Sequence, residues 1–91
     1  MMLDTKHVYR VQISDDAPAC SMHRKLLDAA LVYAEHRANG DTAEVTQIIH
    51  PLRGGQPWTE DATDEAVAEL VRHLENTGQP LLAWLRREVA A

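Results

Sequence analysis

Two segments of the chain alternate hydrophobic and polar residues, namely residues 6–14 and residues 43–49. Alternation with a period of two places the apolar side chains on one face of a β-strand and the polar ones on the other. The apolar positions that share a face are Tyr9, Val11 and Ile13 in the first segment and Val45 and Ile49 in the second. We therefore predict two half-buried strands.

A long amphipathic helix is predicted between these strands. Asp16 is expected to cap it and Pro18 to lie in its first turn, and Asn39-Gly40 supplies its end. At about 100° per residue, its apolar residues cover an arc of roughly 200°. The members of this arc are Met22, Leu26, Leu27, Ala29, Ala30, Leu31, Tyr33 and Ala34. So wide an arc predicts packing against two layers, because a stripe of about half that width serves a surface helix.

Two more helices are predicted in the last third of the chain. The first opens at Asp61 or Thr63 and ends at Thr77-Gly78. Its apolar stripe, at helical spacing, is Val67, Leu70, Val71 and Leu74. The last helix starts near Pro80 and carries the apolar residues Leu81, Leu82, Trp84, Leu85 and Val89. The order of elements is therefore predicted to be β-α-β-α-α.

These elements predict a single α+β domain over residues 1–91, with a two-layer α/β arrangement. If residues 15–42 form a crossover connection, the two strands are parallel. A sheet of two strands is marginal in water and has two open edges. We therefore expect a homodimer, in which a second chain extends the small sheet and covers part of the wide apolar arc.

The composition is that of a folded domain with an acidic surface. Hydrophobic residues make up 45% of the chain, and fourteen acids against nine bases give a net charge of −5. Nucleic-acid binding rests on clustered Lys and Arg, whereas the bases here are scattered and their densest pair is Arg86-Arg87. The last two helices also disfavour a helix-turn-helix, since the final one begins with Leu81 and Leu82 where polar groups are needed. We expect no nucleic-acid partner.

The chain lacks the sequence marks of a membrane or secreted protein. No apolar run approaches the roughly 18 residues of a membrane span, and no secretory signal pattern is visible. Its one cysteine excludes an internal disulfide framework and a cysteine-rich zinc site, which is typical of a reducing compartment. We expect a cytoplasmic protein without a membrane partner, a cofactor or a bound metal.

The irregular segment 50–58 carries the richest set of interaction-prone side chains. His50, Arg53 and Trp58 bring an imidazole, a guanidinium and an indole close together in sequence. Tryptophan and arginine are enriched at the energetic centres of interfaces, and functional residues favour loops on regular scaffolds. With Trp84 of the last helix, these residues form the predicted protein-binding set.

Two other patterns carry candidate chemistry. Cys20 and His23 are predicted to share a face at the start of the first helix, where the helix dipole favours a thiolate. Glu65, Glu69 and His73 are spaced by four on the second helix, as metal ligands can be, although a solvated helix face has the same appearance. Neither pattern is supported by a longer catalytic or metal-binding motif.

The function expected from the sequence is non-catalytic. We predict a regulator, adaptor or inhibitor that acts by binding another protein. The alternative is a small enzyme or ligand-binding protein with a pocket at the dimer seam, lined by His50 and Arg53 or by Cys20 and His23. A pocket that pairs a histidine with a charged partner favours the alternative, whereas a flat exposed patch around a tryptophan favours the binding protein.

Overall fold

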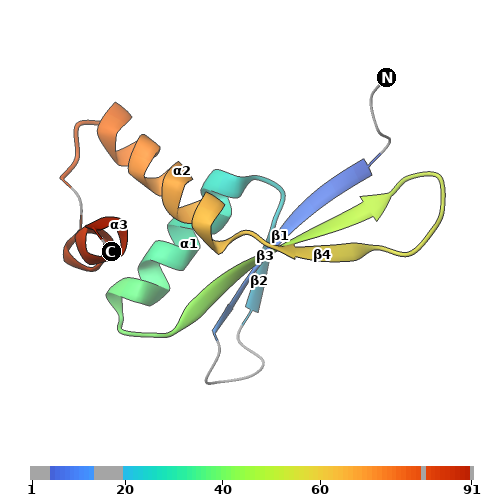
Figure 1. Ribbon diagram of the computed structural model, residues 1–91, viewed down its shortest axis with the longest axis horizontal. Coiled ribbons are helices and arrows are strands. Elements are labelled where there is room, and N and C mark those ends of the chain that lie inside the picture. The colour runs from blue at the N-terminus through green and yellow to red at the C-terminus, as the bar shows by residue number, and fades with distance from the viewer. Residues whose placement is uncertain (1–4, 14–19, 81, 91) are drawn as a thin grey trace.

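The part of the chain that the computed structural model describes, residues 5–13, 20–80 and 82–90, forms a four-stranded antiparallel sheet with helices on one side (Figure 1). Its elements are β1 (Thr5–Ile13), β2 (Cys20–His23), α1 (Leu26–Ala38), β3 (Ala43–Pro51), β4 (Trp58–Asp61), α2 (Thr63–Asn76) and α3 (Ala83–Ala90). The strand order in the sheet is β2-β1-β3-β4.

The α+β class is confirmed, but the order β-α-β-α-α and the two-stranded sheet were wrong. The sequence analysis missed β2 and β4. β2 occupies residues that were assigned to the start of the first helix, and β4 begins inside the irregular segment 50–58 and runs to Asp61. Each of these strands has four residues and lies at a sheet edge, and every residue of β4 is exposed. Edge strands of this kind bury no continuous face, so they leave no clear alternation in the sequence.

β1 and β3 pair in an antiparallel manner, so the alternative of parallel strands was wrong as well. Their register places Val11 opposite Val45, and both side chains are buried. Because side chains alternate between faces, a slip of one strand by one residue would turn its valine toward water. The chain reverses through β2, which pairs with β1, before it enters α1. The predicted cap Asp16 and first-turn Pro18 lie outside the described residues.

The core lies between the sheet and the helices. α1 packs on the sheet and against α2, and its buried residues are Ala29, Ala30, Tyr33 and Ala34. Three of these are alanines, whose small side chains let the helix axis approach its neighbours closely. The Tyr33 ring meets the Trp84 ring of α3 edge-on, with 5.9 Å between centroids and 78° between planes. α1 begins only at Leu26, and the apolar arc is covered in part, since Leu31 remains 43% exposed.

The apolar stripe predicted for the second helix is confirmed in α2. Leu70 and Leu74 are buried, and Val67 and Val71 are partly buried against the same core. A stripe with helical period points to one side of the helix, and here that side faces α1.

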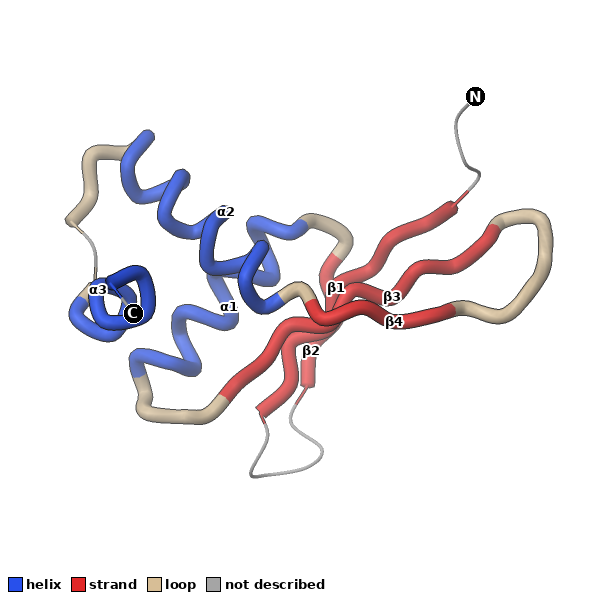
Figure 2. Tube along the Cα trace, in the orientation of Figure 1, coloured by secondary structure: helices blue, strands red, loops and turns tan. Residues whose placement is uncertain are grey.

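One end of the sheet extends beyond the helices. Figure 2 shows the start of β1, the end of β3 and the β3–β4 turn projecting from the body of the molecule. The molecule is accordingly elongated, with principal extents of 43 × 33 × 21 Å. We call residues 48–61, which hold the end of β3, the turn and β4, the hairpin arm.

Candidate functional site

The hairpin arm carries three of the four residues predicted to bind a protein. His50 is half-buried in β3, Arg53 is exposed in the turn, and Trp58 begins β4 with 46% of its surface exposed. The turn reverses the chain through Gly54 and Gly55, whose φ angles are +94° and +103°. These values lie in the region that glycine adopts without steric cost, so the glycine pair of this loop serves the turn.

The sheet register decides which of these side chains face together. Trp58 is paired with Ile49, so the two share a face, and His50, the next residue along β3, points to the opposite face. Ile49 is only 5% exposed, although it does not belong to the core cluster between sheet and helices. The arm thus has a small apolar patch of its own around Trp58, separated by the sheet from the imidazole of His50.

The outer edge of the arm is acidic. β4 pairs with β3 on one side, and no strand of the described chain lies on its other side. Glu60 and Asp61 are exposed on this strand, and Asp64 and Glu65 follow in the first turn of α2, also exposed. An edge strand presents backbone donors and acceptors that another extended chain can pair with. Here carboxylates flank that edge and make it electrically negative.

Trp84 lies apart from the arm. Only 7% of its surface is exposed, and its ring packs on Tyr33 between α1 and α3. The structure therefore does not bring it onto one surface with His50, Arg53 and Trp58.

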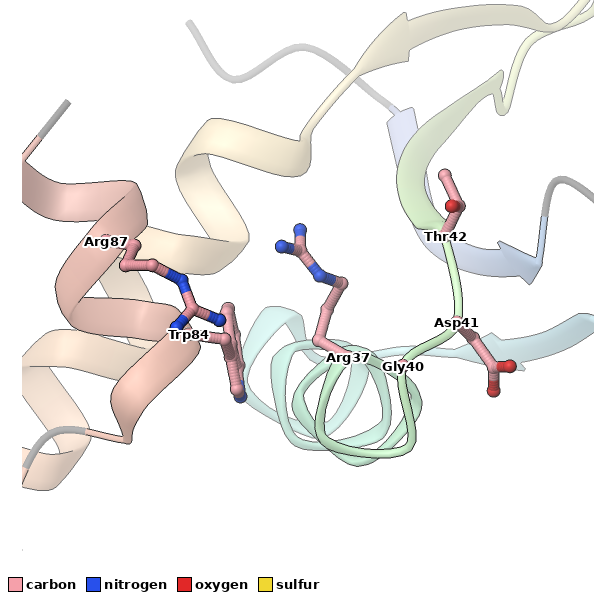
Figure 3. Close-up of a pocket in the computed structure, with 6 residues that line it drawn as sticks. All are labelled: Arg37, Gly40, Asp41, Thr42, Trp84 and Arg87. Atoms are coloured by element: carbon pink, nitrogen blue, oxygen red, sulfur yellow. The ribbon is translucent and has the colours of Figure 1, made fainter.

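Trp84 instead forms a wall of a pocket that the sequence analysis missed (Figure 3). The pocket has a volume of about 330 Å³ and lies between the end of α1, the following loop and α3. Its lining residues are Arg37, Gly40, Asp41, Thr42, Trp84 and Arg87. The one sequence signal for it was the basic pair in the last helix, but only the packing of α3 on α1 places Arg87 and Arg37 on one pocket.

The cysteine–histidine pair of the alternative reading does not form a site. Cys20 and His23 lie on β2, opposite Gln12 and Tyr9 of β1, and residues three apart on a strand point to opposite faces. His23 instead shares a 2.7 Å hydrogen bond with Ser21, two residues away on the same face. The prediction that Cys20 and His23 share a helix face was wrong because these residues form a strand.

Of the three residues spaced by four on α2, namely Glu65, Glu69 and His73, one forms an ion pair within the helix. Glu69 is paired with Arg72 at 3.2 Å, an i,i+3 ion pair on an exposed surface. Over the described residues, no group of three or more His, Cys, Asp or Glu side chains has the geometry to hold a metal ion. In the same residues, no helix combines the length and the apolar character needed to cross a membrane.

Comparison of the chain with protein-family models, with curated proteins and with solved structures finds no match.

Proposed function

We propose that this protein acts by binding another polypeptide through the hairpin arm. The observation that carries the proposal is Trp58, a tryptophan with 46% of its surface exposed on an edge strand outside the core. Large exposed aromatic side chains beside unpaired backbone are typical of protein interfaces, where Trp is enriched among the residues that dominate affinity.

The mode of binding we propose is strand addition at β4. An extended segment of the partner pairs with the open side of Trp58–Asp61 and continues the sheet. Main-chain hydrogen bonds supply affinity in this mode, and alternate side chains supply specificity. The partner's segment covers Trp58 with an apolar side chain and meets Glu60 and Asp61 with Lys or Arg.

Trp58 is large enough to anchor such a contact. A fully buried aromatic side chain removes about 150–250 Å² from water, so covering the exposed part of this indole removes about 100 Å². At about 25 cal/mol per Å² this amounts to about 2–3 kcal/mol, the range of an interface hot spot.

The experiment is selection from a peptide-display library with the intact protein as bait. We expect the selected peptides to place an apolar residue opposite Trp58 and Lys or Arg opposite Glu60 and Asp61, and to bind Trp58→Ser at least about tenfold more weakly. A matched control is Leu31→Ser, because Leu31 is 43% exposed but lies on α1, away from the arm.

Two results would contradict the proposal. The first is a peptide affinity that Trp58→Ser leaves unchanged. The second is an equal loss of peptide affinity in Leu31→Ser, which would indicate non-specific hydrophobic binding. Circular dichroism of both variants is the control that each retains the fold.

Self-association stays a separate proposal. One chain already builds a four-stranded sheet, so a second copy is not needed to complete it. What supports dimerisation is that the opposite sheet edge is basic, with exposed Lys6 on β1 and exposed Arg24 and Lys25 just after β2. Light scattering at micromolar concentration tests it: a salt-sensitive dimer is expected, and a 10.2 kDa monomer at low salt contradicts it.

A further inference from the structure

The pocket between α1 and α3 gathers positive charge in an acidic protein. Of its described lining residues two are arginines, Arg37 and Arg87, while the whole chain carries −5. The arginines come from different helices, about fifty residues apart in sequence. Their presence on one pocket is therefore a property of the tertiary structure.

Arg37 is held in place by aromatic side chains. Its guanidinium carbon lies 5.0 Å from the centroid of the Trp84 ring and 5.8 Å from that of Tyr33. One of its terminal nitrogens also donates a 2.9 Å hydrogen bond to the Tyr33 hydroxyl. A cation that rests on two buried rings keeps its charge in a defined position, which lowers the entropic cost of binding a ligand.

Arg87 supplies a second cation at the same opening. It lies three residues after Trp84 on α3, so both side chains are on one side of that helix. Figure 3 shows its guanidinium beside the indole of Trp84, and Arg87 is exposed to solvent. Arg37 and Arg87 lie in the last turns of α1 and α3, where each also complements the negative end of its own helix. The helix ends alone do not explain why the two cations line one pocket.

The one acidic residue in the described lining of the pocket, Asp41, does not point its carboxylate at the arginines, so it does not repel an anion bound between them. Figure 3 shows the Asp41 side chain turned away from the two arginines. Its carboxylate lies 3.7 Å from Nδ1 of His36. Thr42 adds a hydroxyl at the rim, which can donate to a bound oxygen.

We propose that this pocket binds a small phosphate-bearing molecule through Arg37 and Arg87. The guanidinium group matches phosphate oxygens with parallel N–H donors, and two such cations match the charge of a phosphate monoester, about −1.5 to −2 at neutral pH. The volume of about 330 Å³ is at the lower end for small-molecule sites, so the ligand is a compact phosphorylated metabolite. This site is independent of the hairpin arm and of its partner.

The test uses the fluorescence of Trp84, which Arg37 contacts directly. Trp58→Phe leaves Trp84 as the one tryptophan of the chain. We expect inorganic phosphate, added at constant ionic strength, to change this fluorescence in a saturable manner. Arg87→Ala is expected to weaken the binding about tenfold, as the loss of a charge-assisted contact does.

The matched control is Arg86→Ala. Arg86 is the neighbouring exposed arginine of α3 and does not line the pocket. Equal weakening in the Arg86 and Arg87 variants would overturn the proposal, because the effect would then be general electrostatics. An equal response to chloride, a response to succinate without one to phosphate, or no saturable response at all would overturn it too.

Discussion

Thr63 shows how one side chain closes the junction between sheet and helix. Its hydroxyl accepts a 3.0 Å hydrogen bond from the backbone N–H of Val45 and lies 2.9 Å from the Asp61 carboxylate, to which it donates. Val45 is fully buried, so its N–H has no access to bulk water. The interactions of Thr63 thus tie the start of α2 to β3, next to the last residue of β4.

Replacement of Thr63 by valine tests this junction. Thr63→Val keeps the shape but leaves the Val45 N–H unpaired, so we expect a loss of about 1–3 kcal/mol in the free energy of unfolding. Thr63→Ser keeps the hydroxyl and is expected to lose less than half as much. Urea denaturation measures both, and equal losses in the two variants would show that the hydroxyl has no part in stability.

Trp84 permits a second test at the scale of one residue. Its ring is buried against Tyr33, yet its indole N–H has no hydrogen-bond acceptor among the described residues. Trp84→Phe keeps an aromatic contact and removes the unpaired donor, whereas Trp84→Ala leaves a cavity that costs about 3–5 kcal/mol. We expect the phenylalanine variant to lose less than half as much, measured by thermal unfolding. A similar loss in both variants would mean that the indole N–H has a partner.

Among the elements, the hairpin arm and the helical body depend on different contacts. Leu70 of α2 is 2% exposed in the core, whereas Trp58 of β4 faces solvent beside Ile49. The arm can therefore carry a large apolar side chain for a partner without a large effect on folding, which is what a binding element requires.

This division predicts unequal effects of substitution in the two parts. Leu70→Ala is expected to lower the free energy of unfolding by about 2–5 kcal/mol, because it leaves a cavity. Trp58→Ala removes a cross-strand contact and is expected to cost about 1 kcal/mol or less. Denaturant titrations of the two variants provide the comparison. A larger loss for Trp58 would place the arm within the cooperative core and argue against a free binding surface.

The charge of the whole molecule governs its colloidal behaviour. The chain has five histidines and a net charge of −5 with those histidines neutral, so protonation of all five brings the charge to zero. We expect solubility to be lowest at roughly pH 5 to 6, where repulsion between molecules is weakest. Turbidity measured across pH provides the check, and a minimum above neutral pH would contradict this charge balance.

Local patterning in the sequence was sufficient for much of this fold. The alternation around Val11 and Val45 and the helical stripe of Leu70 and Leu74 identified β1, β3 and α2 correctly. Each of these elements buries one face, and a buried face requires apolar residues that recur with the period of the strand or helix. The prolines and glycines of residues 50–58 predicted an irregular segment there, but not the exposure of Trp58 on an edge strand.

The tertiary structure alone decided the edge strands and both candidate sites. β2 and β4 exist because β1 and β3 offer them hydrogen-bonding partners, and neither strand buries a continuous face that a sequence pattern could reveal. The same holds for the sites: register sends Trp58 and His50 to opposite faces, and helix packing places Arg87 and Arg37 on one pocket. The periodicity of a sequence indicates which face of a helix or strand is buried. Which strands pair and which helices pack together depends on residues far apart in the chain, and only the folded structure brings those residues together.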